Sequence, residues 1–296
     1  MPSISSLDPS CPVRPSVTSV GVVVPTHNSA RTIGACLKSL RAQTVACQIV
    51  VVDNHSSDST VRIARPLADH ILILGPERSA QRNAGARALR CDWLGFIDSD
   101  MILNPKVVAN IIAVSQLGAV SIVIPERTIG TGFWAAVRTF ERGFYMDDQN
   151  LEAARFFRND VFARLGGFDE TLTGPEDWDL AARARALGPV GRTTAEVVHL
   201  EQGLTLREAC RKKAYYAPGL SAYRAKYGTA HFVRHLNRRY IRQPWRLVFP
   251  HPLLGAGLLV LKFSELAMVC RVLIFPPGQL ARVRSARDAP TRNEGP

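Results

Sequence analysis

Three short polar segments in the first third of the chain carry side chains suited to binding a nucleotide and a metal ion. They are Pro25-Thr26-His27-Asn28, Asp53-Asn54-His55-Ser56-Ser57-Asp58 and Asp98-Ser99-Asp100. In the third segment, two carboxylates separated by one residue offer hard oxygen ligands, which bind Mg²⁺ or Mn²⁺ together with substrate phosphates. A metal held there would neutralise a diphosphate leaving group. The segment therefore predicts a divalent-metal site.

Asp53 follows three valines and has no evident role in capping a helix. A buried carboxylate at a strand end is costly unless it is paired. Accepting an N–H from a uracil or guanine ring would satisfy it, and Arg82 is a candidate neighbour, although Arg82 could also be an ordinary surface arginine. Asn28 and Asp58 have a second explanation, because Asn and Asp commonly cap the next helix.

Capping does not explain Asp98 and Asp100, because Asn104-Pro105 is the more natural start of the following helix. The elements that position these residues are short apolar runs rich in Val and Ile, at residues 19–24, 48–52, 70–74, 93–97 and 119–124. Helical patterns lie between them, at 30–43, 58–68, 79–90 and 105–116. Strands that alternate with helices predict an α/β fold with a parallel sheet covered on both faces. Such sheets bind ligands at the carboxyl ends of their strands, so the polar segments should form one site.

The second half of the chain mixes helices and strands. Helices are expected at 133–145, 159–165 and 176–187, a strand at 196–200, and a basic helical region from 205 to 242. We expect disordered ends at 1–16 and 286–296, a catalytic domain at 17–203 and a helical extension at 204–285. The six cysteines form no C-x-x-C pair, which favours buried free thiols in a reducing compartment.

Positive charge is concentrated in one part of the chain. The 296 residues carry a net charge of +12, and residues 201–250 contain eleven Lys and Arg against two Glu. Residues 247–275 are mostly apolar but are interrupted by Lys262, Glu265 and Arg271. We judge the uninterrupted part too short to span a bilayer and favour an interfacial helix, with a core or oligomer helix as the alternative.

Six motifs occur in order along residues 20–199: P-T-H-N, V-V-D-N-x-S-x-D-x-T, R-N-x-G, D-S-D, G-G-F-D-E and P-E-D-W-D-L. Together they resemble glycosyltransferase family 2, a large inverting family with the GT-A fold, a mixed sheet flanked by helices. The resemblance implies that Pro25, Thr26, Asn28, Asp53 and Arg82 bind the nucleotide of a nucleotide-sugar.

The same resemblance implies roles for the acidic motifs. Asp98 and Ser99 would contact the nucleotide and Asp100 would bind Mn²⁺ or Mg²⁺. Asp177 of the Glu176-Asp177 pair would be the general base that activates an acceptor hydroxyl. As an alternative, this pair could simply place favourable charge at a helix N-terminus. Some relatives use a histidine near His199 as a further metal ligand, although a lone histidine in an apolar strand is as often structural.

The acceptor is less well defined by the sequence. Processive members of the family carry Q-x-x-R-W and several membrane spans, whereas Gln202 is followed by Gly-Leu-Thr, so we expect single sugar additions. Arg211, Lys212, Lys213 and Tyr216 combine charge with aromatic rings and suit phosphate groups at an interface. They suggest a lipid-linked acceptor such as a polyprenyl phosphate or diphosphate, in cell-envelope glycan synthesis at the inner face of the membrane. A solvated helix face with an oligomer contact is the alternative.

Other function classes fit less well. The glycine patterns of nucleotidyltransferases, dehydrogenases and P-loop kinases are absent after the first strand. A non-catalytic nucleotide-binding or nucleic-acid-binding protein would explain the basic segment. It would leave the acidic strand ends and Asp177 without a purpose, so we expect no nucleic-acid partner. UDP is the preferred donor nucleotide and GDP stays open, because Asp53 would accept from either base.

Overall fold

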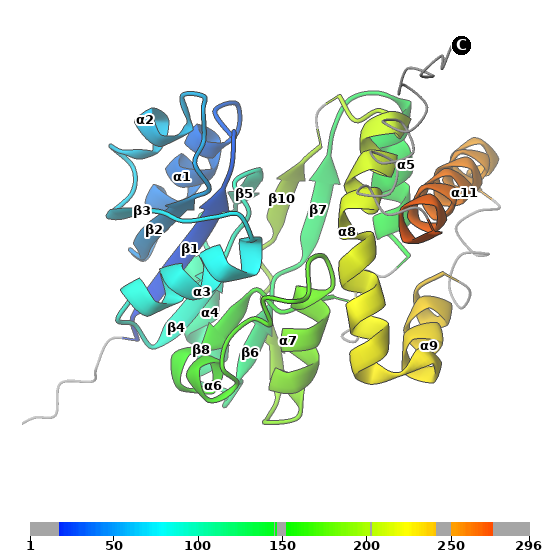
Figure 1. The fold of residues 1–296 in the computed structure, drawn as a ribbon. Coiled ribbons are helices and arrows are strands. Elements are labelled where there is room, and N and C mark those ends of the chain that lie inside the picture. Colours follow the sequence, from blue (N-terminus) through cyan, green and yellow to red (C-terminus); the bar gives the residue numbers. More distant parts are fainter. Residues whose placement is uncertain (1–17, 145, 147–151, 202, 241–249, 275–296) are drawn as a thin grey trace, which may run out of the picture.

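The computed structural model describes residues 18–144, 146, 152–201, 203–240 and 250–274. Its main sheet has the strand order β3-β2-β1-β4-β8-β6-β9, and a smaller sheet has the order β5-β10-β7 (Figure 1). The strands are β1 (Val20–Thr26), β2 (Gln48–Asp53), β3 (His70–Ile73), β4 (Trp93–Phe96), β5 (Met101–Leu103), β6 (Ser121–Val123), β7 (Glu126–Ile129), β8 (Phe156–Arg158), β9 (Val190–Arg192) and β10 (Val197–Leu200).

Helices cover both faces of the main sheet, as the sequence predicts. They are α1 (Ile33–Arg41), α2 (Thr60–Ala64), α3 (Arg78–Ala88), α4 (Val107–Ser115), α5 (Phe133–Arg142), α6 (Asn159–Arg164), α7 (Glu176–Arg185), α8 (Leu206–Tyr227), α9 (Thr229–Tyr240) and α11 (Pro252–Ile274). Successive side chains of β1 point to opposite faces of the sheet. Val22 and Val24 pack with α1 and α4 on one face, whereas Val23 packs with α3 on the other.

The sheet is mixed rather than wholly parallel. The five predicted strands are present and β1, β2, β3 and β4 run parallel, but β8 pairs antiparallel with both β4 and β6. The alternation of runs and helices did not reveal β8, because this strand has three residues and follows no long apolar run. The strands β5, β7 and β9 are similarly short and were not predicted.

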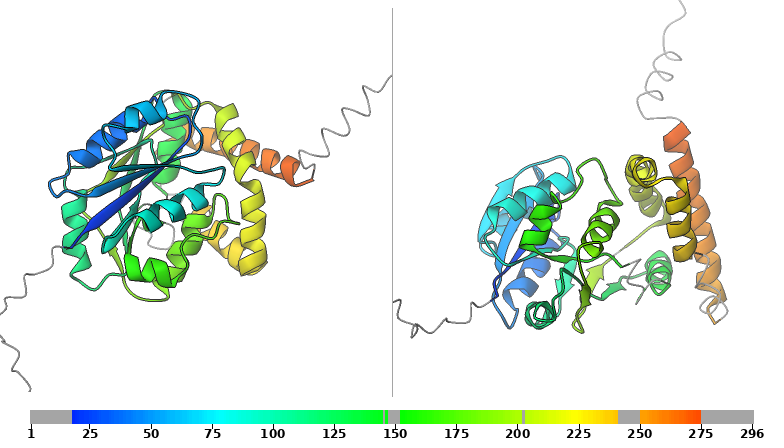
Figure 2. Two further views of the ribbon diagram at one scale, coloured as in Figure 1. Left: turned by 60° about the vertical axis from the view of Figure 1, so that its left-hand side comes forward. Right: turned by 90° about the horizontal axis from the view of Figure 1, so that it is seen from below.

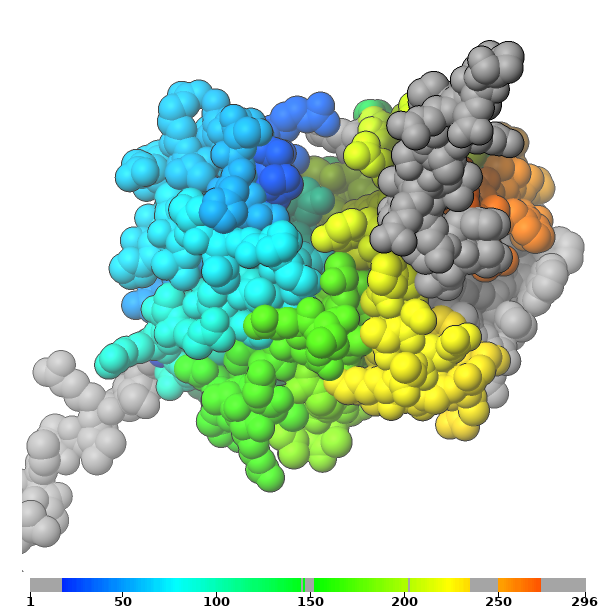
Figure 3. Space-filling view, in the orientation of Figure 1, coloured from blue at the N-terminus to red at the C-terminus, as the bar shows by residue number. Residues whose placement is uncertain are grey.

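The region after residue 203 forms a helical layer beside the sheets (Figure 2). Helix α8 begins with a capping box, in which Thr205 and Glu208 satisfy each other's backbone N–H groups. Lys226 and Tyr227 at its other end contact Asp179 of α7. Figure 3 shows the yellow residues of this layer packed directly against the green residues of α7.

Helix α11 lies within the apolar segment at 247–275, as the sequence predicts. Residues Pro252–Val272 have a mean hydropathy of 1.8 and form a helix long and apolar enough to cross a membrane, although a core helix passes the same test. Two of its three charged residues, Lys262 and Glu265, form ion pairs with Glu141 and Arg138 of α5, whereas Arg271 is exposed. The uninterrupted apolar run ends at Lys262, within this helix, and the interfacial placement of the segment stays a prediction.

The buried ion pair between Arg138 and Glu265 should hold α11 on α5. The two side chains are 2.8 Å apart and at most 13% exposed. We expect Glu265→Gln to lower the free energy of unfolding by about 2 kcal/mol, because Arg138 loses a charged hydrogen-bond partner. Glu196→Gln, in the exposed pair with Arg127, should cost less than about 1 kcal/mol. Equal losses in urea denaturation would contradict this account.

Candidate active site

The predicted polar segments do meet at one edge of the main sheet. Thr26 and Asp53 are paired residues at the ends of β1 and β2, and Asp98 follows β4. Asn28 lies in the left-handed region, with φ of 48°, and its side-chain oxygen accepts from the Ser57 N–H at 2.9 Å. Asp58 accepts from the Ala30 N–H at 3.1 Å in the same way. Both side chains thus tie the two strand-end loops together, a role beyond helix capping.

Two adjoining cavities open at this edge. The strand-end pocket, of about 360 Å³, is lined on one side by Pro25, Thr26, His27, Ser29, Asn54, Pro76, Arg78, Gln81, Ser99, Asp100 and Thr173, and on the other by Lys212 and Tyr215. The α7 pocket, of about 290 Å³, is lined among others by Glu126, Arg142, Arg155, Asp177, Trp178, Lys213 and Leu220. Asp98, His199 and Tyr216 line both pockets.

Asp100 and His199 lie side by side where the pockets meet, as predicted for metal ligands. Asp100 Oδ2 is 3.0 Å from His199 Nε2, and Asp100 Oδ1 is buried with no hydrogen-bond partner among the described residues. Burial would raise the pKa of Asp100, but the hydrogen bond from His199 and the positive charges of His199 and Lys212 hold it below its ordinary value. An ionised carboxylate with an orphaned oxygen beside an imidazole fits a divalent cation.

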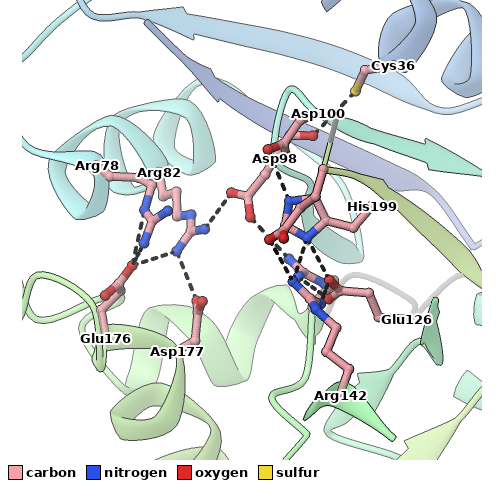
Figure 4. Close-up of polar contacts among 12 residues, drawn as sticks. Cys36, Arg78, Arg82, Asp98, Asp100, Glu126, Arg142, Glu176, Asp177 and His199 are labelled. Atoms are coloured by element: carbon pink, nitrogen blue, oxygen red, sulfur yellow. Dashed lines mark hydrogen bonds and ion pairs between the residues drawn. The ribbon is translucent and has the colours of Figure 1, made fainter. Parts of the chain in front are cut away.

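The described residues contain no cluster of three or more His, Cys, Asp and Glu that would enclose a metal. Mg²⁺ and similar ions are commonly held by one or two protein groups, with substrate phosphates and water as the other ligands. The pair fits that pattern. Glu126 of β7, which the sequence did not single out, lies 2.8 Å from His199 Nδ1, where Arg142 also approaches (Figure 4). Glu126 can accept an N–H from Nδ1, whereas Arg142 can only donate to this nitrogen, so the two partners favour opposite tautomers of the ring.

Arg82 is a buried cation shared by three carboxylates. Its side chain is 1% exposed, and its nitrogens lie 2.8 Å from Asp98, 2.9 Å from Asp177 and 3.3 Å from Glu176. The expectation that Arg82 pairs with Asp53 was wrong. The Asp53 carboxylate instead accepts from the backbone N–H and hydroxyl of Ser56, at 2.8 and 2.5 Å. Asp53 is 1% exposed and does not line the strand-end pocket, whereas its neighbour Asn54 does.

The guanidinium that does line the strand-end pocket belongs to Arg78, one turn before Arg82 on α3. That spacing places the two arginines on one helix face and was a signal available in the sequence. Arg78 binds Glu176 at 2.5 Å and lies over the ring of Tyr216. Burial would lower the pKa of Arg78, but the Glu176 carboxylate raises it well above its ordinary value.

The two acids of the Glu176-Asp177 pair have different surroundings. Glu176 is fully buried, is held by Arg78 and Arg82, and accepts from the Gly174 N–H. Asp177 keeps 31% of its side chain exposed and lines the α7 pocket. Glu176 therefore positions its neighbours, while Asp177 is the member of the pair that can reach a ligand.

The charge of Arg82 should stabilise the fold most strongly at neutral pH. Burial would raise the pKa of Asp98, but Arg82, Arg78 and Arg155 together hold it well below its usual range. We expect Arg82→Gln to lower the free energy of unfolding by about 3 kcal/mol at pH 7, because buried carboxylates lose their counter-charge. The Asp98 part of this difference is fully present above about pH 4, the ordinary Asp pKa, and fades as the pH falls toward the lower pKa of the folded state.

Urea denaturation at pH 7 and pH 3.5 would measure this difference. Arg158→Gln is the matched control, since Arg158 pairs with Asp160 on the surface, where an ion pair contributes about 1 kcal/mol or less. A loss for Arg82→Gln that equals the control, or one that grows as the pH falls, would contradict the account.

Comparisons with known proteins agree with this geometry. Residues 21–168 match the sequence model of the family described as Glycosyl transferase family 2. The succinoglycan biosynthesis protein ExoO of Rhizobium meliloti is 26% identical over 223 residues, covering 65% of this chain and 64% of that protein. Validoxylamine A glucosyltransferase of Streptomyces hygroscopicus is 27% identical over 218 residues, covering 57% and 52%. The chain thus spans between about half and two thirds of the length of these relatives.

Solved structures show the same fold at low sequence identity. S. aureus TarS in complex with UDP-GlcNAc gives a TM-score of 0.55 at 17% identity, over 85% of this chain and 82% of that one. Mannosyltransferase PcManGT from Pyrobaculum calidifontis, in complex with GDP-Man and Mn²⁺, gives 0.55 at 19% identity, over 90% and 84%. This likeness confirms the expected GT-A fold, with its mixed sheet and C-terminal helices. Because the family match covers half of the chain, this protein belongs to glycosyl transferase family 2.

Proposed function

We propose that this chain is an inverting glycosyltransferase that moves one sugar from a nucleoside-diphosphate sugar to an acceptor hydroxyl. The observation that carries the proposal is the meeting of two pockets at Asp98 and His199, with Asp100 in the first pocket and Asp177 in the second. One pocket suits a nucleotide and the other an acceptor. A relative's complex with UDP-GlcNAc and another's with GDP-Man support a donor of this class, with UDP preferred and GDP as the alternative.

The chain's own residues account for the steps of a single displacement. The nucleotide would lie in the strand-end pocket near Thr26 and Asn54, with its diphosphate toward Asp100 and His199, the pair that would hold Mn²⁺ or Mg²⁺. When bound, that ion would neutralise the leaving diphosphate. Asp177 would take the proton of the acceptor hydroxyl as its oxygen attacks the anomeric carbon and the bond to the phosphate breaks. Arg82 keeps Asp177 in place.

A matched pair of variants separates metal binding from base catalysis. Asp100→Ala should abolish metal-dependent binding of UDP or GDP, because the cation loses its carboxylate ligand. Asp177→Asn should leave nucleotide binding intact but slow transfer about 10²- to 10⁴-fold, since the hydroxyl loses its base. Calorimetry with UDP and GDP, with and without Mn²⁺, and turnover of a nucleotide-sugar panel would measure both effects. Absence of nucleotide binding by the wild type under every metal condition would refute the proposal.

We further propose that the protein works peripherally at the cytoplasmic face of the cell membrane on a lipid-linked acceptor, such as a polyprenyl phosphate or diphosphate. The outer face of α11 supports this, because it exposes Leu253, Leu259, Val260, Phe263 and Leu266. A helix with such an apolar face lies in the interfacial layer of a bilayer. Figure 2 shows α11 at the outer side of the helical layer, where it is accessible to a surface.

The basic residues of α8 divide between the surface and the two pockets. Arg211 is exposed and lines neither pocket, so it suits phosphate groups at the membrane surface. Lys213 and Tyr216 line the α7 pocket, where an acceptor phosphate would enter. Lys212 lines the strand-end pocket instead, which supports a role for it at the donor rather than at the acceptor.

Vesicle binding tests the membrane proposal. The wild type should sediment with vesicles rich in anionic lipid, and Phe263→Asp should weaken this binding about tenfold, because the exposed ring that would insert into the bilayer is lost. Leu117→Asp makes the same kind of change at an exposed leucine just beyond α4 and should have no effect. A wild type that stays in the supernatant, or equal effects of the two variants, would argue against membrane contact and for an oligomer contact of α11.

A further inference from the structure

Helix α8 forms a wall between the two pockets. Lys212, Tyr215 and Tyr216 line the strand-end pocket, a spacing of three and four residues that defines one helix face. Lys213, Tyr216 and Leu220 line the α7 pocket, which defines the adjacent face. Neighbouring positions on an α-helix are about 100° apart, so two consecutive lysines serve two different pockets.

Close backbone packing fixes α8 in this position. A Cβ atom at Gly219 would lie 2.0 Å from the carbonyl oxygen of Thr173, so the helix backbone touches the loop that precedes Glu176. Gly174 in the same loop has φ of +107°, and a Cβ there would meet Tyr216 at 2.9 Å. Helix α8 is therefore packed against the segment that carries Asp177, and Lys212 lies two turns before this contact on the same helix.

The arginines near the strand-end pocket are already paired with carboxylates. Arg78 is paired with Glu176, Arg82 with three carboxylates, and Arg155 with Glu126 and Asp98. Lys212 makes no ion pair with any residue that the structure describes, and it lines the strand-end pocket together with Asp100 and His199. A diphosphate entering this acidic edge requires positive charge that is not already neutralised.

We infer that Lys212 binds the diphosphate of the donor and stabilises it as a leaving group, so that the C-terminal helix completes a donor site whose other residues lie mostly within the family match at 21–168. This inference rests on the proposed function. In the transfer, the acceptor oxygen bonds to the anomeric carbon and the bond from that carbon to the β-phosphate oxygen breaks. The electron pair stays on the phosphate and the acceptor proton goes to Asp177. The Lys212 ammonium keeps its protons and donates N–H bonds to the phosphate oxygens.

Nucleotide titrations test the role of Lys212. Calorimetry in the presence of Mn²⁺ would compare UDP with UMP, or GDP with GMP if the wild type binds guanine nucleotides. Lys212→Gln should weaken diphosphate binding about ten- to a hundredfold, the loss of one charged hydrogen bond, and change monophosphate binding less than about twofold. Lys212→Arg should restore most of the diphosphate affinity, because it keeps the charge.

Arg207→Gln is the matched control, since Arg207 is an exposed cation on the same helix and lines neither pocket. It should leave both affinities unchanged. The inference is overturned if Lys212→Gln weakens mono- and diphosphate binding equally, if it weakens neither, or if Arg207→Gln has the same effect as Lys212→Gln. A wild type that binds no nucleotide would refute the proposed function itself, before any variant is compared.

Discussion

The arrangement of the site depends on one buried guanidinium. Arg82 joins Asp98 after β4 to Glu176 and Asp177 at the start of α7. Three carboxylates with little access to water would repel one another. The central cation offsets this repulsion and fixes the three groups relative to one another. The acidic strand end and the candidate base are therefore held by the same group. The sheet supplies the edge, but the geometry between the two pockets comes from this ion cluster.

The sequence predicted the elements that have local signals. Runs of Val and Ile marked the strands of the first half, and the register of parallel strands brought the polar segments to one edge. The partners of Arg82 could not be predicted in that way, because they lie 16, 94 and 95 residues away along the chain. Glu126 escaped notice for a similar reason: its strand has four residues and only Thr128 in it is buried.

Many of the residues that line the two pockets lie outside the region that matches the family. Residues 21–168 contain the strand-end segments, but Thr173, Asp177, His199 and α8 close both pockets. The family-matched core thus lines most of the strand-end pocket, the proposed nucleotide site. The helical layer is held on α5 and α7 by ion pairs, and its helix α8 contributes residues to both pockets.

The contact between Gly219 and Thr173 constrains how this protein can change over evolution. Because the backbones touch there, α8 has a fixed rotational register relative to the catalytic loop. Inserting or deleting one residue between Leu206 and Gly219 would turn every earlier side chain by about 100° and exchange which pocket each one faces. Substitutions at exposed positions of the segment would keep this register, whereas insertions would be tolerated only in the loops at either end of the helix.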